Sequence, residues 1–358
     1  MDYKGRKERL IKLLKEKDLS GYLTNNPAII EYFTGIHATT NPPKDLLLVV
    51  FKDEFYLITP LLESEYLKNF AKNNQIIEWK PNQKIEDIIC KLIEPKEKIG
   101  YESFIANYKL IAKLMRKGVR FRDIRDSIIA LRSVKEKEEI EIIKKAVEIT
   151  EKALKLAKEL INEGGYTEEE VAKEVYLAMI KNGCEGLAFD PIIATGENAA
   201  YPHYIPSNIR IKQNAFTLVD IGGRYKSYCA DLTRTFLNGK INDKMRNVYN
   251  AVREALDLAI SKIKDGISCK DVDLVARNYL KTKNLDQYFI HSLGHGIGIE
   301  IHELPTISMR SKSKLLKNMI VTIEPGVYIK NELGIRLEED VLVLEEGAEV
   351  ISSFPLDF

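Results

Sequence analysis

The chain has 358 residues and a formal net charge of +1, with 45% hydrophobic and 30% charged residues. This length exceeds that of a single hydrophobic core, so we expect two domains, and the composition is that of a globular protein, which excludes a disordered chain. The near-zero net charge gives no reason to expect nucleic acid or an anionic membrane as a partner, and the longest apolar run, residues 46–51, is far too short to cross a membrane.

The N-terminal part of the chain alternates helical and strand patterns. Leucines at helical spacing follow the charged start of the chain and predict a helix that ends near the Ser-Gly pair at 20–21. Residues 21–25 have the pattern of a strand, and residues 45–59 that of a hairpin that turns at 52–54. We therefore expect a small α/β domain over residues 1–125.

The first residues and the cysteines of the chain indicate its cellular compartment. Its first residues lack the apolar core of a signal peptide, and the four cysteines of the chain are widely spaced, with no CxxC pair. We therefore expect free thiols in a reducing, cytoplasmic environment. The histidine of the N-terminal part, His37 in YFTGIHATT, is expected to be a loop or core residue before a metal ligand.

A second unit is predicted to begin at Ser133, after a linker over residues 126–132. Ser133 and Glu136 have the spacing of a capping box, and a long amphipathic helix follows up to the glycine pair at 164–165. The segment 167–183 repeats this pattern, with a threonine cap, a glutamate three residues later and a glycine at its end.

Beyond these two helices the pattern changes and then recurs. The chain becomes strand-rich over 186–238, a second helix pair is predicted over about 242–282, and a second strand-rich stretch begins at 289. Two helices followed by strands, twice over, predict a pseudo-duplicated α+β domain over residues 133–358.

Three of the five histidines fall within the fifteen residues HSLGHGIGIEIHELP at 291–305: His291, His295 and His302. Neutral imidazole is a common metal ligand, although a tight turn is the plainer explanation. The glycines disfavour a zinc-binding helix, the general-base glutamate of HExxH is absent, and the run lacks the spacing of a dinucleotide-binding loop. The metal interpretation therefore predicts further ligands elsewhere in the chain.

Carboxylates at the ends of apolar strands supply such ligands. Asp220 ends one predicted strand and Asp231 lies in the next, so a hairpin could place both on one face. Glu324 ends another buried strand before a Pro-Gly turn. The period of two places three more charged residues on one face of a strand: Arg336, Glu338 and Asp340. Each acid alone could be a turn residue, but several buried acids need a compensating charge, which a pair of divalent cations would supply.

The ordered set of Asp220, Asp231, His295, Glu324 and Glu338 resembles that of the pita-bread metallopeptidases. The matching segments are DIGG…DLTRTF, HSLGHGIGIEIHELP, TIEPGVYI and GIRLEED, and the resemblance covers essentially the whole chain. YFTG resembles part of the small N-terminal domain of prolidase, aminopeptidase P and creatinase. Methionine aminopeptidases lack that domain and creatinase does not keep the metal ligands. The resemblance therefore implies a creatinase/prolidase-type α/β domain followed by a pita-bread catalytic domain.

The resemblance also implies a centre of two divalent metal ions. Asp231 and Glu338 would bridge the two ions, Asp220 would complete the ligands of one, and His295 with Glu324 those of the other. Ligation mostly by oxygen favours Mn²⁺ or Co²⁺, with Zn²⁺ possible. A hydroxide between the metals would be the nucleophile, and Glu324 would accept the proton of the water.

Residues around the metals receive roles from the same resemblance. His203 and His302 would contact the peptide and stabilise the tetrahedral intermediate, although His203 could be an ordinary loop residue. His291 matches a further active-site histidine. Arg336 would orient the carboxylate ligands, and a simple ion pair is the alternative.

These expectations together predict an enzyme that hydrolyses the Xaa-Pro bond, with dipeptides as the first choice of substrate. Prolidases often carry an arginine just after the HExP proline, where this chain has Thr306, so we expect Arg310 to bind the substrate carboxylate unless it is a solvated loop residue. An Xaa-Pro aminopeptidase acting on longer peptides is the nearest alternative, and a catalytically inactive pita-bread binding module is the alternative from another class. Family analogy predicts a homodimer that binds a small peptide and neither nucleic acid nor membrane.

Overall fold

The structure, a computed structural model, describes residues 1–38, 45–69 and 74–357. The chain divides into two compact units, Met1–Arg132 and Ser133–Phe358. Residues 126–132, expected as a linker, lie in helix α6 (Arg125–Ser133). None of the helices in the described ranges is both long and apolar enough to cross a membrane.

Unit 1 is built on a mixed six-stranded sheet in the order β4-β3-β2-β1-β5-β6. The predicted hairpin is present: β2 and β3 pair antiparallel, and Lys52 and Asp53 have φ values of 52° and 66°, as in the tight turns whose twist matches that of the strands. His37 lies after α2, and its Nδ1 is 3.3 Å from Glu31 Oε1. The other elements of unit 1 are α1 (Tyr3–Glu16), β1 (Gly21–Thr24), α2 (Pro27–Thr34), β2 (Leu47–Phe51), β3 (Glu54–Pro60), α3 (Leu61–Lys68), β4 (Gln75–Trp79), α4 (Ile85–Leu92), β5 (Lys98–Tyr101), α5 (Tyr108–Arg116) and β6 (Arg120–Asp123).

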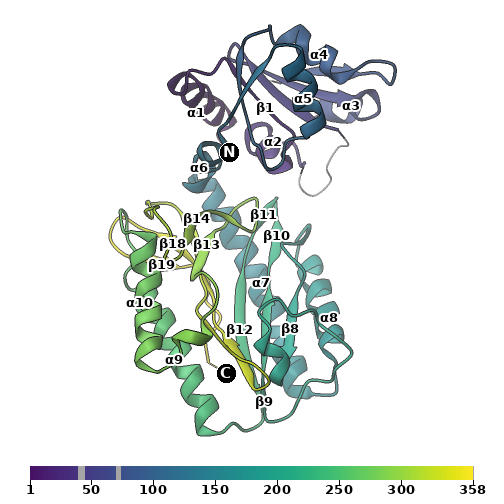
Figure 1. Ribbon diagram of the computed structural model, residues 1–358. Coiled ribbons are helices and arrows are strands. Elements are labelled where there is room, and N and C mark those ends of the chain that lie inside the picture. Colours follow the sequence, from purple (N-terminus) through teal and green to yellow (C-terminus); the bar gives the residue numbers. More distant parts are fainter. Residues whose placement is uncertain (39–44, 70–73, 358) are drawn as a thin grey trace. The chain divides into compact units, whose positions relative to one another are not determined.

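Unit 2 contains the predicted repeat of two helices followed by strands (Figure 1). The first set is α7 (Lys137–Glu163), α8 (Glu168–Lys181), β7 (Gly186–Leu187), β8 (Ile192–Thr195), η1 (Gly196–Ala200), β9 (Ala215–Ile221), β10 (Gly223–Tyr225), β11 (Tyr228–Cys229) and β12 (Leu232–Asn238). The second set is α9 (Asp243–Ile260), α10 (Cys269–Thr282), η2 (Asp286–Tyr288), β13 (Gly294–Gly296), β14 (Glu303–Ile307), β15 (Ile320–Ile323), β16 (Gly326–Ile329), β17 (Leu333–Arg336), β18 (Glu339–Val343) and β19 (Ala348–Val350).

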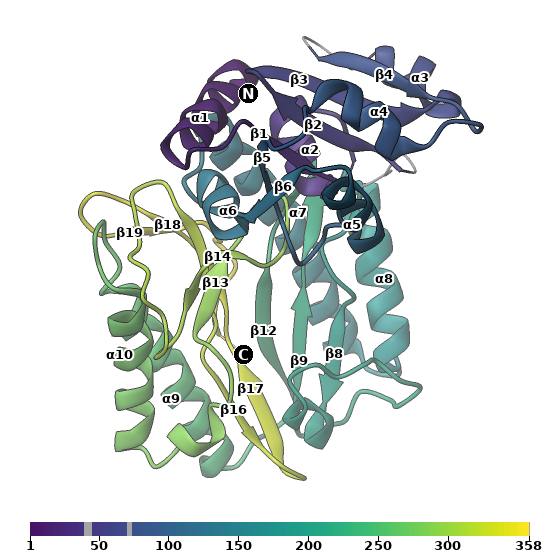
Figure 2. The ribbon, with the colours of Figure 1, turned by 45° about the horizontal axis from the view of Figure 1, so that its top comes forward.

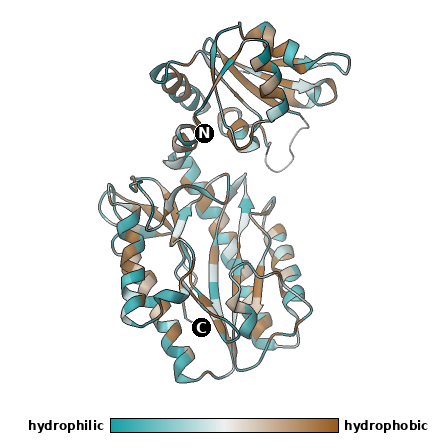
Figure 3. Ribbon diagram, in the orientation of Figure 1, coloured by the Kyte–Doolittle hydropathy of each residue, from teal (hydrophilic) through white to brown (hydrophobic). Residues whose placement is uncertain are grey.

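The two helix pairs of unit 2 flank its strands from opposite sides, with α9 and α10 on one side and α7 and α8 on the other (Figure 2). The helices carry alternating hydrophilic and hydrophobic segments, as expected when one face is buried (Figure 3). The apolar face of α9 and α10 packs on β15, β17 and β18 in a shared core that includes Val252, Leu256, Val321, Ile335 and Val341. This packing holds the strands that carry the predicted acids in fixed positions.

One of the two predicted capping boxes is wrong. Thr167 and Glu170 form the expected reciprocal bonds at the start of α8. Helix α7, however, begins at Lys137 with Glu136 as its cap and Glu139 as the reciprocal partner, so Ser133 does not cap it. Residues 134–135 are instead held in tertiary contacts: Val134 bridges Met319, and Lys135 N donates to Asn318 O.

The strand predicted to carry Arg336, Glu338 and Asp340 is interrupted, which corrects the sequence interpretation. Arg336 ends β17, which pairs with β16, whereas Asp340 lies in β18, in a different sheet. Between the two strands, Glu338 N donates to Thr233 O at 3.1 Å. The chain therefore crosses from one sheet to the other at Glu338, beside the edge of β12.

Candidate active site

A cleft of about 740 Å³ in unit 2 collects most of the residues that the sequence singled out. The predicted residues among those that line the cleft are His203, Asp220, Asp231, His291, His295, His302, Glu324, Arg336 and Glu338. Arg310 is exposed in a turn after β14 and is not among the described residues that line the cleft. The structure thus brings nine of the ten predicted residues together and leaves Arg310 outside.

Strand pairing places the acids beside one another. Asp220 lies near the end of β9 and pairs with Thr233 of β12, while Asp231 directly precedes β12, so both reach the same end of this hairpin. Glu324 follows β15, and Glu338 joins β17 to β18. The carboxylates therefore converge from separate strand ends, where the backbone is fixed by ladder hydrogen bonds.

Three potential ligands form a compact cluster. One ligand atom each of Asp231, His295 and Glu338 lies within 4.8 Å of the others. His295 Nε2 is 3.7 Å from Asp231 Oδ2 and 3.6 Å from Glu324 Oε1. His295 Nδ1 lies 3.0 Å from Gly296 O, an acceptor that keeps the proton on Nδ1 and leaves the Nε2 lone pair directed at the carboxylates.

The electrostatics of the cluster favour cation binding. Burial, followed by the charge of Glu338, raises the pKa values of Asp231 and Glu324 well above their ordinary range. Burial and the neighbouring Asp220 raise the pKa of Glu338 to about 8. Burial lowers the pKa of His295 to about 4, which keeps its imidazole neutral. Crowded acids beside a neutral imidazole form a site that divalent cations would stabilise.

An orphaned oxygen supports the same conclusion. Asp220 Oδ2 accepts from Arg336 Nη2, but the buried Asp220 Oδ1 has no hydrogen-bond partner among the described residues. A buried carboxylate oxygen without a donor is costly unless a cation occupies its open side. The donor set of carboxylates and one imidazole therefore fits one or more divalent metal ions.

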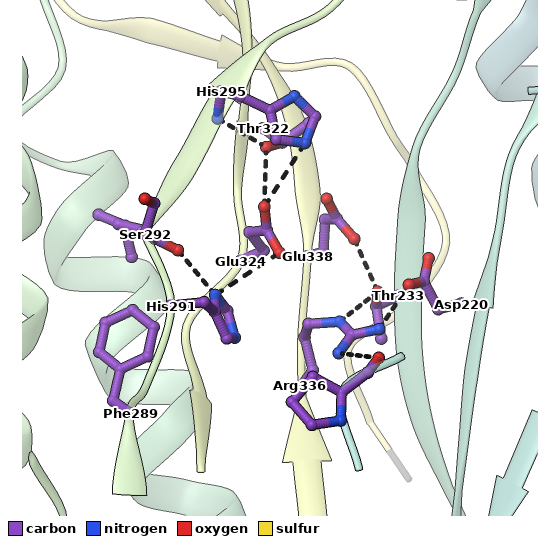
Figure 4. Close-up of polar contacts among 12 residues, drawn as sticks. Asp220, Thr233, Phe289, His291, Ser292, His295, Thr322, Glu324, Arg336 and Glu338 are labelled. Atoms are coloured by element: carbon purple, nitrogen blue, oxygen red, sulfur yellow. Dashed lines mark hydrogen bonds and ion pairs between the residues drawn. The ribbon is translucent and has the colours of Figure 1, made fainter. Parts of the chain in front are cut away.

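Arg336 is the centre of a hydrogen-bond network behind the acids (Figure 4). Besides Asp220, its guanidinium donates to Thr233 Oγ1 at 3.1 Å, to Tyr328 OH at 2.8 Å and to Pro202 O at 3.3 Å. Thr233 Oγ1 in turn donates to Glu338 Oε2 at 2.6 Å. Arg336 thus fixes two of the five predicted ligands, one directly and one through Thr233.

His291 lies against this network. Its Nδ1 is 2.7 Å from Ser292 O and its Nε2 is 2.9 Å from Tyr328 OH, so Nδ1–H donates to the carbonyl and Nε2 accepts from the tyrosine. Burial, and then the charge of Arg336, lowers the pKa of His291 to about 4. His291 Nδ1 is 4.0 Å from Glu324 Oε2, so His291 lies beside the carboxylates (Figure 4). The hydrogen bond with Tyr328 OH fixes the other side of the imidazole ring.

His302 and His203 are both exposed to the cleft. The rings of His302 and His295 meet edge to face, with centroids 4.5 Å apart. His203 lies on the segment 201–207 that follows η1. Exposed imidazoles beside the acid cluster can donate a hydrogen bond to a substrate bound there.

The sequence interpretation did not assign two residues of the network, Thr233 and Tyr328. Thr233 lies two residues after Asp231, so the period of two of a strand could have placed it on the same face. Tyr328 lies four residues after Glu324, beyond a turn, and no local pattern indicates its contact with His291. Asp340, expected beside Glu338, instead accepts from Asp231 N at 3.0 Å through Oδ2 and supports the backbone of that residue.

Comparisons with known proteins agree with this geometry. The chain is 39% identical to an Xaa-Pro dipeptidase of Pyrococcus furiosus over 97% of both chains. It superimposes on the Xaa-Pro dipeptidase from Bacillus anthracis with a TM-score of 0.92 at 31% identity, covering 99% of each chain. It also superimposes on the X-Pro aminopeptidase from Thermotoga maritima with a TM-score of 0.86 at 32% identity, covering 98% of this chain and 99% of the other.

Two family models divide the chain as the structure does. The model of the Creatinase/Prolidase N-terminal domain matches residues 6–134, and that of metallopeptidase family M24 matches residues 141–345, which include all the cleft residues described above. The predicted fold, a small N-terminal domain and a pseudo-duplicated catalytic domain, is confirmed. The chain therefore belongs to metallopeptidase family M24 and carries a creatinase/prolidase N-terminal domain.

Proposed function

We propose that this chain is an Xaa-Pro dipeptidase. The observation that carries the proposal is the cluster of Asp231, His295, Glu338 and the adjacent Asp220 and Glu324 in one cleft, within a metallopeptidase fold. These five residues would hold two divalent cations. The cations, when bound, would polarise the peptide carbonyl and lower the pKa of a water molecule.

The side chains around the cluster would bind the substrate and move the proton. Glu324 Oε1 faces His295, and Glu324 Oε2 faces His291. This carboxylate would accept the proton of the attacking water. His302 and His203 would donate hydrogen bonds to the carbonyl oxygen as negative charge develops on it. Arg336 would hold the Asp220 carboxylate in place through its guanidinium hydrogen bond.

An Xaa-Pro aminopeptidase stays the second candidate because of the charges in the cleft. Among the described lining residues, the lysine and arginine side chains are Lys173 and Arg336. Arg336 is committed to its network, and the exposed Lys173 forms an ion pair with Glu169 at 3.3 Å. A dipeptide carboxylate would therefore have to engage Lys173 or a histidine, whereas a longer peptide needs no such contact.

The discriminating experiment compares Ala-Pro, Ala-Pro-Ala and Ala-Ala with metal-loaded protein. We expect kcat/KM to be highest for Ala-Pro and negligible for Ala-Ala. A higher kcat/KM for Ala-Pro-Ala would replace the dipeptidase by the aminopeptidase, and hydrolysis of neither proline peptide would reject both. Mn²⁺ or Co²⁺ as the native metal, a homodimer and a cytoplasmic location stay predictions, which metal analysis, sedimentation and cell fractionation would check.

A further inference from the structure

The carboxylate of Glu168, outside the cleft, is fully buried and yet forms no ion pair with any described lysine, arginine or histidine of unit 2. Its Oε1 accepts from Thr195 N and from Asn198 Nδ2, both at 2.9 Å. Its Oε2 accepts from Tyr204 OH at 2.9 Å, and from Ser207 Oγ at 2.9 Å and Ser207 N at 3.2 Å. Five hydrogen bonds thus replace the hydration of this buried carboxyl group.

The donors come from the two ends of one segment. Thr195 and Asn198 lie where residues 195–207 leave β8, and Tyr204 and Ser207 lie where the segment returns. Each carboxylate oxygen therefore fastens one end, and the carboxylate closes the segment into a loop. Glu168 can do this because it is the first residue of α8, which lies beside β8 (Figure 1).

The fastened loop forms one wall of the cleft. Its lining residues are Pro202, His203, Tyr204, Ile205 and Pro206, and Tyr204 lines the cleft while its hydroxyl bonds Glu168. The middle of the loop has a second anchor, since Pro202 O accepts from Arg336 Nη1 at 3.3 Å. His203 is thus bracketed between Arg336 on one side and the Glu168 bonds on the other.

We propose that Glu168 is a positioning residue of the peptidase site, which fastens the loop 195–207 and so holds His203 and the Tyr204–Pro206 wall against the substrate. The inference rests on the proposed role of His203 in the hydrolysis of Xaa-Pro dipeptides. Glu168 does not touch the acid cluster, so its effect should be on turnover and not on metal binding. A displacement of about 1 Å of a group that contacts the reacting bond can cost about a hundredfold in rate.

Glu168→Gln is the sharpest perturbation because it keeps the shape of the side chain. An amide can accept on one side only, so its NH2 group must face either the N–H donors of Thr195 and Asn198 or the N–H of Ser207. In either orientation at least one N–H donor loses its acceptor, which weakens the attachment of that end of the loop. Glu174→Gln, the same change at an exposed position of α8, is the matched control.

The test is a double-mutant cycle with metal-loaded, full-length protein and Ala-Pro. We expect Glu168→Gln to lower kcat/KM by about ten- to a hundredfold with unchanged metal content, and to have less than about a threefold effect in the His203→Ala background. Glu174→Gln should match the wild type. An equal loss of kcat/KM in both backgrounds, or no loss in a folded Glu168→Gln variant, would overturn the proposal. Ser207→Ala, which removes one donor, replaces Glu168→Gln in the cycle should the latter fail to fold.

Hydrogen exchange separates this inference from the proposed function. Residues 195–207 should exchange faster in Glu168→Gln than in the wild type, whether or not the protein hydrolyses Ala-Pro. An unchanged exchange rate would refute the fastening itself. If the losses of turnover in His203→Ala and Glu168→Gln multiply in the double variant, the positioning role of Glu168 is rejected. The proposed peptidase function is unaffected by that result.

Discussion

Thr233→Val tests whether the residues behind the acids control metal binding. The Thr233 hydroxyl donates to Glu338 Oε2 at 2.6 Å and accepts from Arg336 Nε at 3.1 Å. Valine has nearly the same shape, so the substitution opens no cavity and removes only these two bonds. The Glu338 carboxylate then loses a donor that orients it, and Arg336 Nε is left buried without that acceptor.

The expected loss of metal affinity follows from the charges of Glu338 and Arg336, the two hydrogen-bond partners of Thr233. A hydrogen bond to a charged group contributes about 1.5 to 3 kcal/mol, and loss of a residue that orients a metal ligand typically costs about 10- to 100-fold in affinity. We therefore expect Thr233→Val to weaken the binding of Mn²⁺ or Co²⁺ by about 10- to 100-fold, as measured by calorimetric titration of the chelator-treated protein.

Thr235→Val is the matched control, because its hydroxyl lies two residues further along β12 and donates to a backbone acceptor, Arg336 O, at 2.9 Å. It should bind metal nearly as the wild type does. Wild-type affinity in Thr233→Val, or an equal loss in Thr235→Val, would refute the reasoning.

Three further predictions concern pH, packing and a buried ion pair. The pKa of Glu338 is about 8 in the metal-free fold against an ordinary 4.5, so between these pH values the folded state binds more protons than the unfolded state. The free energy of unfolding should therefore fall as pH rises from about 4.5 to 8. Melting temperatures measured in chelator should fall over this range, a rise would contradict the prediction, and added metal should reverse the loss. A Cβ at Gly334 would lie 1.7 Å from Ala199 O, so Gly334→Ala should displace η1 and lower both melting temperature and kcat/KM, and a variant unchanged in both would refute this packing. Lys135 Nζ and the carboxylate of Glu303 form a buried ion pair at 3.0 Å. Lys135→Met should therefore reduce the free energy of unfolding, measured by denaturant titration, by about 3 to 5 kcal/mol. A loss below about 1 kcal/mol would show that the charge of Glu303 is compensated elsewhere.

Features encoded by local chemistry could be predicted from the sequence. The apolar spacing of α7 and the capping residues of α8 depend on neighbours within a few positions, and Thr167 and Glu170 bond as expected. The acids of the proposed metal site could be singled out because carboxylates at the ends of apolar strands are costly without a cation. The resemblance then gave their expected roles.

Features decided by tertiary contacts could not be predicted. Ser133 and Glu136 had a capping spacing, but Ser133 ends helix α6 and Lys135 is held in a buried pair with Glu303, so α7 starts about one turn later than expected. The alternation from Arg336 to Asp340 is the same on both sides of Glu338, so periodicity gave no sign that the chain changes sheets there. Arg310 was chosen by sequence proximity to the histidines, and a turn of two or three residues is enough to direct a side chain away from the cleft.

The central claim is that the acid cluster binds two divalent cations that are required for the hydrolysis of Xaa-Pro peptides. The most direct measurement is the metal content per chain, by elemental mass spectrometry, of the wild type, Asp231→Ala and Asp190→Ala, together with their hydrolysis of Ala-Pro. Asp190 lines the same cleft but lies outside the predicted ligand set, so its variant should keep both metals. We expect two metals and activity in the wild type, and loss of both metals and of activity in Asp231→Ala. Two tightly bound metals in Asp231→Ala, or full activity of the metal-free wild type, would contradict it.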